Sequence, residues 1–487
     1  MNATSSSLAE IAARYEAALP PGTLFSFPVT VLDTALQTGA VPSWSVTLIP
    51  GSSSGGHGYG WDDAQAKVSA LGELHERLQS TLVVPKLPTE QASYTDLFTT
   101  YGAGAVIDPL TLSLPAGSPY TPELTRLWTT MTRFGTGEAV WVPLETAASS
   151  PTELPEGYDP LYTSVSNGLG AGFSTEQALS HALFELLQRD GNSVNYRALD
   201  RGIGVDLSGA ALPERVTGLL DRFAAAGIDV RVKLAATDFG LVNLYVVGAQ
   251  AAGEEPGIMA AGAGEACGAD RNVTLEKALL EFAAARTRLA FNHGPLGAVE
   301  KIAPPEYLNL YREAFSTIPE EARALGAMKG WVGLEPRALR DRLNPVYDVR
   351  SQVAWADLPH SRPTDALTDA VARLSGFELL YLELATPEAK EHGVIAVKAV
   401  VPGLEVETVS YGRLSARNLR RLLERGSPLA GLGPPPAGAA PVRLTAEAEA
   451  TFGGPAWLDV GALVALTEPL YPLYREPTRH AVRWNES

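Results

Sequence analysis

Residues 56–77 read GHGYGWDDAQAKVSALGELHER, and residues 168–189 read GLGAGFSTEQALSHALFELLQR. The two stretches are identical at ten of twenty-two aligned positions, at a constant offset of 112. Each begins with spaced glycines and continues in a helical pattern that carries Glu73 or Glu185. The duplication predicts that one local structure occurs twice, with a carboxylate at the same place in both copies.

A looser third copy follows 96 residues after the second, where GADRNVTLEKALLEFAAARTR places Glu281 at the position of Glu185. All three copies have a residue that favours a helix N-cap, and a glutamate stands eleven residues after it. These caps are Asp62, Ser174 and Asp270. Ser174 and Gln177 also have the spacing of a capping box. We therefore predict three helices that begin alike and present a carboxylate at equivalent positions.

The remaining sequence predicts a mixed α/β chain with helices and strands interspersed. Residues 1–22 are expected to contain a short helix that begins at a serine cap and ends at Pro20-Pro21. Residues 304–375 are expected to be mostly helical. The segments predicted as strands are FPVTVL, WSVTLIP, AVWVPL, VRVKLAA, LVNLYVVGA, LLYLELA and GVIAVKAVVPGLEV.

Composition excludes several classes of protein. The chain of 487 residues has a formal net charge of −17, which argues against a nucleic-acid or anionic-membrane binder because both need a basic face. It contains no run of about eighteen apolar residues, so we expect no membrane span. Its single cysteine, Cys267, excludes an internal disulfide and a multi-cysteine metal site. The N-terminal residues lack the pattern of a secretory signal, and we expect a cytoplasmic protein.

The charged residues of the repeats suggest a cation site. Glu73, Glu76 and Arg77 share one helix face, and Glu185, Gln188 and Arg189 occupy the corresponding face of the second copy. The plain alternative is a solvated, charged helix face. Small apolar residues flank these carboxylates, however, and a buried carboxylate is costly unless it is paired or bound to a cation. Glutamates and arginines together suit Mg²⁺ and nucleotide phosphates. No G-x-x-x-x-G-K-[ST] sequence is present, so we expect no P-loop.

Four stretches in the same order make this chain resemble the YcaO family. They are GGHGYGWDDAQAKVSALGELHER, SNGLGAGFSTEQALSHALFELLQRD, GEACGADRNVTLEKALLEFAAARTR and VIAVKAVVPGLE. The similarity extends from about residue 25 to residue 420. It implies a YcaO-type ATP-binding α/β fold with internally repeated glycine-loop and helix units and mixed sheets. Family members use Mg-ATP to phosphorylate the oxygen of a backbone amide in a peptide or protein, so the resemblance implies ATP and Mg²⁺ as cofactors.

The resemblance also implies roles for particular residues. As magnesium ligands it implies Glu73, Glu76, Glu185 and, at the position of a further ligand, Gln188. For contacts with the nucleotide it implies Gly56, His57, Gly58, Ser69, Arg77, Asn167, Arg189, Glu281 and Arg286. The chemistry is coherent, because an amide is a poor electrophile and phosphorylation turns its oxygen into a leaving group.

Three features depart from the family pattern. Gln188 stands where the family usually has a second glutamate, His57 stands where a lysine is common, and the chain ends REPTRHAVRWNES instead of in a proline-rich tail. We therefore expect a reaction other than azoline formation, such as thioamidation or another modification of a peptide made by ribosomes. Two alternatives stay open: a YcaO-like binding or scaffold protein with altered ATP chemistry, and an ATP-dependent ligase or kinase of a small metabolite.

Partners follow only from the resemblance. It implies a peptide or protein substrate and a TfuA-like or ThiF-like partner protein, and a homodimer is a fair default for an enzyme. The expected segments are an N-terminal helical extension (1–24), the catalytic domain (25–425), a Gly/Pro/Ala-rich connector (426–441) and a C-terminal segment (442–487).

Other residues have plainer interpretations. His75 and His181 are expected to be packing or supporting groups off the face of the glutamates. Asp190 is expected either to orient Arg189 or to form a structural ion pair. Cys267 is expected to be a small buried residue and not a nucleophile. Residues 396–401 are expected to be a core strand, followed by a turn at Pro402-Gly403-Leu404.

Overall fold

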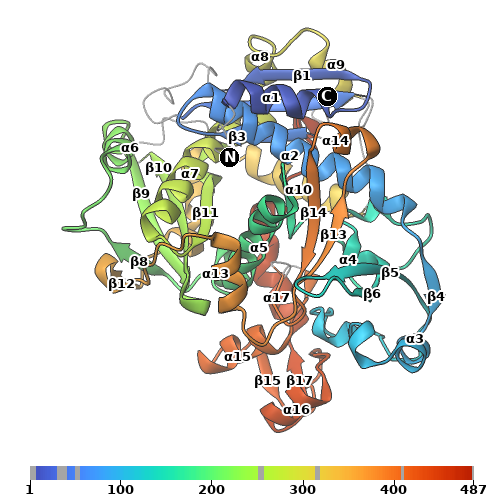
Figure 1. Ribbon diagram of the computed structural model, residues 1–487. Coiled ribbons are helices and arrows are strands. Elements are labelled where there is room, and N and C mark those ends of the chain that lie inside the picture. The colour runs from blue at the N-terminus through green and yellow to red at the C-terminus, as the bar shows by residue number, and fades with distance from the viewer. Residues whose placement is uncertain are drawn as a thin grey trace. The chain divides into compact units, whose positions relative to one another are not determined.

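The computed structural model describes residues 7–29, 41–49, 55–250, 257–312, 319–406 and 411–484 (Figure 1). The chain forms two compact units. Unit 1 comprises residues 1–74, 195–362 and 468–487, and unit 2 comprises residues 75–194 and 363–467. Helix α2 (Asp63–Val83) runs from the one into the other. The four consecutive segments predicted from the sequence divide the chain differently from these two units, each of which is discontinuous in sequence, so the predicted segments stay a prediction.

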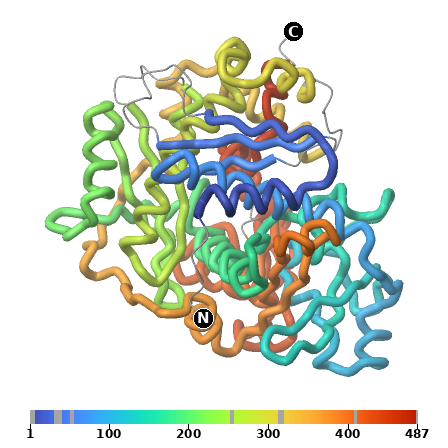
Figure 2. Tube along the Cα trace, turned by 45° about the horizontal axis from the view of Figure 1, so that its top comes forward, coloured from blue at the N-terminus to red at the C-terminus, as the bar shows by residue number. Residues whose placement is uncertain are grey.

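Unit 1 contains two sheets. Their strands are β1 (Thr23–Pro28), β2 (Ser43–Ile49), β3 (Gly55–Tyr59), β8 (Ile203–Asp206), β9 (Ile228–Ala236), β10 (Val242–Gln250), β11 (Ala263–Gly268) and β12 (Ser351–Ala354). The first sheet is antiparallel in the order β1-β2-β3, and the second has the order β11-β10-β9-β8-β12. Only its β12–β8 pair is parallel among the described pairings of unit 1. Helix α1 (Leu8–Ala17) lies along the three-stranded sheet (Figures 1 and 2).

The other helices of unit 1 are α6 (Glu214–Ala225), α7 (Arg271–His293), α8 (Leu296–Val299), α9 (Tyr307–Arg312), α10 (Pro319–Val332), α11 (Pro336–Arg342), α12 (Asn344–Tyr347) and α18 (Ala481–Trp484). Helices α6 and α7 pack on the five-stranded sheet. The aromatic rings of Phe27, Phe291 and Tyr307 meet in the core, with the Phe27 and Tyr307 centroids 5.0 Å apart. This contact fixes α7 against the three-stranded sheet, because β1 contributes Phe27.

Unit 2 is built on a sheet of the order β4-β5-β13-β14-β7, with β6 paired to β5. Helix α5 packs on β7 and β14. A small sheet of the order β15-β17-β16 completes the unit. The strands are β4 (Glu90–Ala92), β5 (Arg126–Arg133), β6 (Ala139–Pro143), β7 (Leu169–Gly172), β13 (Leu380–Leu384), β14 (Ile395–Val400), β15 (Ala430–Leu432), β16 (Ala440–Pro441) and β17 (Ala456–Leu458). The helices are α3 (Tyr94–Tyr101), α4 (Leu144–Ala147), α5 (Thr175–Asn192), α13 (Ala366–Arg373), α14 (Pro387–Glu391), α15 (Ala416–Glu424), α16 (Ala446–Phe452) and α17 (Val460–Thr467).

Most predicted elements are confirmed. Six of the seven predicted strands coincide with β2, β6, β9, β10, β13 and β14, and FPVTVL overlaps the end of β1, while its residues 30–32 lie outside the described residues. Ser7 caps α1 in a full capping box. Residues 304–375 are mostly helical where the structure describes them, and β12 is the exception. No described helix combines the length and the apolar character that a membrane span needs.

The three repeats fold as a strand followed by a helix: β3 and α2, β7 and α5, β11 and α7. Each of these strands lies at one end of the strand order of its sheet. The repeated glycines bring strand and helix into backbone contact. A Cβ added at Gly58, Gly170 or Gly264 would lie 1.9, 2.1 or 2.0 Å from a carbonyl oxygen of its own helix. Only glycine allows this approach, so the glycines of the repeats have a packing role.

The predicted caps begin all three helices. Asp62 accepts from Gln65 N, Ser174 from Gln177 N, and Asp270 from Asn272 N and Val273 N. Of the capping box predicted at Ser174, the bond from Gln177 N to the serine side chain is present, but the return bond between the Gln177 side chain and the backbone of Ser174 is not the one observed. The Gln177 side chain accepts the N–H of Phe173, one residue before the cap, at 3.0 Å. Gln65 accepts the N–H of Trp61 in the same way at 3.0 Å, so the shared glutamine closes the turn before the helix.

Candidate active site

The glutamate of each repeat is held by a backbone N–H of the strand before its helix or, in the second copy, of Gly168 just before that strand. In all three copies a backbone N–H of the strand segment donates to the carboxylate of the helix that follows. These bonds join His57 N to Glu73 Oε2 (2.8 Å), Gly168 N to Glu185 Oε2 (3.2 Å) and Glu265 N to Glu281 Oε2 (3.1 Å). The bond fixes the side chain and satisfies part of the carboxylate, which is partly buried in each case. The repeated segment is therefore a device that presents an oriented carboxylate.

Two of these carboxylates belong to one polar cluster in unit 1. The Tyr59 hydroxyl donates to Glu281 Oε2 at 3.5 Å. Burial raises the pKa of Tyr59 well above its usual value, and the charges of Glu281 and Glu73 raise it further. The Arg288 guanidinium also interacts with both carboxylates, which raise its pKa after the larger effect of Glu476. Glu73 and Glu281, 208 residues apart in sequence, thus act on the same neighbours.

The arginine of α7 that reaches this cluster is Arg288, two residues after Arg286, which is predicted to contact the nucleotide. Arg286 is only 2% exposed, and its Nη1 donates to the carbonyl oxygens of Gly248 at 3.1 Å and Met259 at 3.4 Å. These bonds tie α7 to β10 and to the turn before β11. The contact of Arg286 with a nucleotide stays a prediction, and its observed partners give it a structural role.

The second repeat places its charged residues in unit 2. Arg189 Nη2 lies 3.5 Å from Glu185 Oε1, and both side chains are 23% exposed. Gln188 is buried. The carboxylate of Asp190 accepts from Arg417 and Arg421 at 2.6 to 2.8 Å. Burial opposes the charge of Asp190, but these two arginines overcome it and lower the pKa of the carboxyl group. The structural ion pair, one of two interpretations of Asp190, is the observed one.

Three further predicted residues lie on or near α2. Ser69 and Arg77 are exposed. Glu76 is partly buried, and His181 Nε2 lies 3.6 Å from its Oε1. His181 is four residues before Glu185 and so is close to the face of the glutamates, and its contact with Glu76 agrees with the predicted supporting role. His75 is fully buried, as expected of a packing group. His57 lies in β3, and its Nε2 is 3.2 Å from Asn292 Oδ1.

Asn167 stands just before β7, where Lys398 of β14 organises the backbone. Lys398 Nζ donates to the carbonyl oxygens of Val165 and Asn167, both at 2.7 Å. A pocket of about 60 Å³ opens beside Asn167 and Lys398. The buried Nδ2 of Asn167 has no hydrogen-bond partner among the described residues. An unsatisfied amide is costly to bury, and a bound acceptor would satisfy it.

Burial lowers the pKa of Lys398 to about 8, which makes stability depend on pH. The Lys398 amine binds its proton more tightly in the unfolded chain than in the folded protein, so the free energy of unfolding rises with pH between the two pKa values. The gain is complete above the pKa of lysine in the unfolded chain and is lost as the pH falls to about 8. Between pH 7.5 and 9.5 the wild type should gain about 2 kcal/mol of unfolding free energy relative to Lys398→Met. Denaturant unfolding of both proteins at the two pH values measures it. Parallel changes in the two proteins would contradict the shift.

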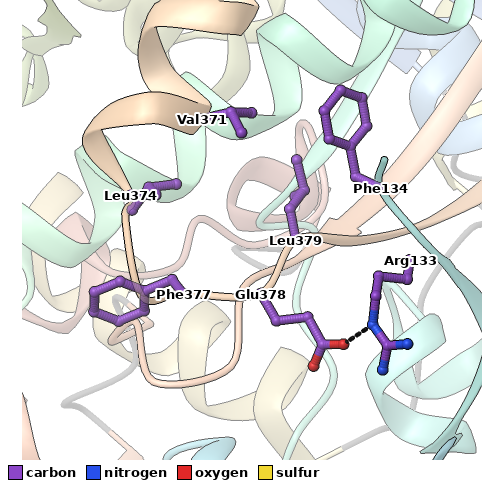
Figure 3. A pocket seen from close by; sticks show the side chains of 7 residues that line it. All are labelled: Arg133, Phe134, Val371, Leu374, Phe377, Glu378 and Leu379. Carbon is purple, nitrogen blue, oxygen red and sulfur yellow. Dashed lines mark hydrogen bonds and ion pairs between the residues drawn. The ribbon is translucent and has the colours of Figure 1, made fainter. Parts of the chain in front are cut away.

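A larger pocket of unit 2, about 320 Å³, is separate from these residues. It is lined by Arg133, Phe134, Val371, Leu374, Phe377, Glu378 and Leu379 (Figure 3). Its polar side is the ion pair of Arg133 and Glu378. None of the residues predicted for nucleotide or metal binding, all of which the structure describes, lines this pocket.

The donor set fits Mg²⁺ with a nucleotide. No group of three or more His, Cys, Asp and Glu side chains is arranged to hold a metal ion by itself within the described ranges. Mg²⁺ seldom needs such a group, because one or two carboxylates with phosphates and water complete its six ligands. In unit 1 the carboxylates of Glu73 and Glu281, with Arg288 as a shared charged neighbour, suit that requirement. In unit 2 the unsatisfied Asn167 amide is a separate donor that suits a nucleotide acceptor.

Sequence reasoning missed several of these residues. Arg288 had a signal, because it stands seven residues after Glu281 and so shares its helix face. Lys398 also had one, as the charged residue of an apolar strand segment. Glu476 had no such signal in the sequence, since it is 188 residues from its partner Arg288.

Cys267 lies in β11 and is partly buried. Of residues 396–401, predicted as strand, 396–400 are confirmed as part of β14, and Gly403 turns the chain with φ 90°.

The family model described as YcaO cyclodehydratase, ATP- and Mg²⁺-binding, matches residues 57–405. This chain belongs to the YcaO family. It is an ATP-dependent enzyme of that family, with ATP and Mg²⁺ as cofactors and, in general, the activation of a backbone amide as its reaction. The fold is confirmed as the mixed α/β YcaO fold.

Individual relatives agree with this assignment. An uncharacterized protein of Methanothermobacter thermautotrophicus is 27% identical over 371 residues, 74% of this chain and 84% of that protein. YcaO from Methanopyrus kandleri, solved with AMPPCP and Mg²⁺, superposes with a TM-score of 0.55 at 18% identity, over 84% of this chain and 92% of that one. A heterocyclase solved with substrate and cofactor gives a TM-score of 0.59 at 17% identity, over 82% of this YcaO protein. The match covers only 52% of the heterocyclase.

Proposed function

We propose that this YcaO protein uses Mg-ATP to activate a backbone amide in a peptide or protein, through the carboxylates of its three repeated helices. The observation that carries the proposal is the backbone hydrogen bond to the glutamate, which occurs in all three repeats. A purely solvated helix face would have no reason to fix its carboxylates in this way. ATP, when bound, supplies the phosphoryl group that converts the amide oxygen into a leaving group.

We assign the protein's part in this reaction to charge and position. Glu73, Glu76, Glu185 and Gln188 are proposed to hold magnesium, and Arg77 and Arg189 to neutralise phosphate charge. Asn167 is proposed to donate its unsatisfied Nδ2–H to the nucleotide, since Lys398 holds its backbone in place. Gly56, His57, Gly58, Ser69, Glu281 and Arg286 complete the set predicted to contact ATP.

The product is proposed to be something other than an azoline, with a thioamide as the first candidate. What supports this is the departure of the chain from the family pattern at Gln188 and His57. A peptide substrate and a TfuA-like or ThiF-like partner, or a second copy of the chain, are proposed on the same resemblance.

Titration of the purified protein with AMPPCP tests the cofactor site. We expect binding at millimolar Mg²⁺ and a loss of affinity of at least about tenfold when Mg²⁺ is removed, because carboxylates without a cation repel the phosphates. Slow ADP release from ATP in the presence of a substrate peptide should follow. Equal affinity with and without Mg²⁺, or no binding, would contradict the proposal.

Gln188 favours the second candidate, a protein that binds nucleotide or peptide without turnover. A glutamine oxygen can coordinate Mg²⁺ but lacks the negative charge of glutamate, and Gln188 is buried. In the same titration, Gln188→Glu separates the two functions. Wild-type protein that binds Mg-AMPPCP but releases no ADP, together with ATPase activity gained by Gln188→Glu, would favour the binding protein.

A further inference from the structure

One face of α7 carries three polar residues in register. Glu281, Arg288 and Asn292 are separated by seven and four residues, so their side chains project from the same side of the helix. Arg288 Nη2 lies 2.7 Å from Glu476 Oε1. Glu476 belongs to the segment after Leu473 and is 24% exposed at its side chain. The face that bears Glu281 is thus met by a carboxylate from the far end of the sequence.

Glu476 binds α7 at more than one point. Its Oε2 accepts from Asn292 Nδ2 at 3.3 Å and lies 3.2 Å from His293 Nε2. Burial opposes the charge of Glu476, but Arg288 and His293 outweigh it and hold the pKa of the carboxyl group well below its usual value. Glu476 is therefore ionised at neutral pH and stays beside Arg288.

Three carboxylates interact electrostatically with Arg288. Glu476 acts on it most strongly, and Glu73 and Glu281 also stabilise its charge. Without Glu476, we expect the long arginine side chain to turn toward Glu73 and Glu281, whose charges also act on it, because an arginine seeks a carboxylate partner in a partly buried site. Such a pair would compete with a cation for the same oxygens.

We propose that Glu476 is a positioning residue that holds the Arg288 guanidinium beside Glu73 and Glu281, where Arg288 meets the phosphates of a bound nucleotide. The inference rests on the proposed function. It assigns Glu476 the task of keeping Glu73 available to Mg²⁺ and Glu281 available to the nucleotide. Arg479, three residues later, donates to Gly56 O at 3.2 Å and Ser45 Oγ at 3.0 Å, so the same segment also fixes the strand that anchors Glu73.

Binding of AMPPCP with Mg²⁺ tests the inference in the full-length protein. We expect Glu476→Gln, which keeps the shape but removes the charge, to weaken binding about tenfold and to raise the Mg²⁺ concentration needed for half-saturation. Arg288→Ala should weaken binding at least as much. In the Arg288→Ala background, Glu476→Gln should change affinity by less than about twofold, because its effect passes through Arg288.

Glu468→Gln is the matched control. Glu468 pairs with Arg323 at an exposed position of the same C-terminal part of the chain, so this variant should bind like the wild type. The inference would be overturned if the effects of the Arg288 and Glu476 substitutions on affinity multiply independently. Normal binding by Glu476→Gln would also overturn it, and in both cases the proposed function would stand. Wild-type protein that does not bind Mg-AMPPCP would overturn both. Should Glu476→Gln fold poorly by circular dichroism, Arg288→Gln breaks the same ion pair from the other side. It should weaken Mg-AMPPCP binding about tenfold, and wild-type binding by Arg288→Gln would again contradict the inference.

Discussion

Glu185→Gln should reduce ATP turnover by at least about 100-fold, since it removes one charge from an oriented carboxylate that we propose as a magnesium ligand. The substitution keeps the side-chain shape and an oxygen that can still accept the N–H of Gly168. Its cost in stability should be small, because the ion pair with Arg189 is 23% exposed on both sides. ADP release and AMPPCP affinity, each measured against Mg²⁺ concentration, report the effect.

Glu176→Gln provides the control for this prediction. Glu176 lies in the first turn of the same helix and is exposed, so the same chemical change there should leave turnover within about twofold. If both variants lose activity alike, a general effect on α5 is responsible. If Glu185→Gln keeps full activity, Glu185 is not a ligand, and the cation site must be sought elsewhere on the chain.

Gly58→Ala should cost at least about 3 kcal/mol of unfolding free energy, because the added methyl group overlaps a helix backbone and not a movable side chain. The Cβ would lie 1.9 Å from Ala66 O and 2.2 Å from Ala70 N. Strand β3 would have to move away from α2, and the bond from His57 N to Glu73 would lengthen. We therefore expect a lower melting temperature together with weaker Mg-AMPPCP binding.

Gly218→Ala is the opposite case. Gly218 lies in α6 with nothing within 4 Å of an added Cβ, so alanine there should raise stability by up to about 1 kcal/mol. Chemical denaturation of both variants and the wild type measures the difference. A Gly58→Ala protein as stable as the wild type would show that strand and helix tolerate separation, and would remove the packing role assigned to the repeated glycines.

Local sequence determined much of this protein. The caps at Asp62, Ser174 and Asp270, the helices after them and most strands follow from short-range rules, because capping, backbone freedom and apolar periodicity act within a few residues. The repeat also identified the three glutamates, since equal local sequences fold alike. Even the partner of each carboxylate is local, only 16 or 17 residues away along the chain.

Only the tertiary structure decided which arginine of α7 interacts with Glu73 and Glu281. Arg286 and Arg288 are two residues apart on α7 and point in different directions, and nothing in the sequence says that β10 covers the one while Glu476 meets the other. The same holds for Lys398, whose burial sets its pKa, and for His181, which meets Glu76 on another helix. The burial of a side chain and its interactions with distant charges depend on which segments, far apart in sequence, pack together. A short-range sequence pattern does not predict that packing.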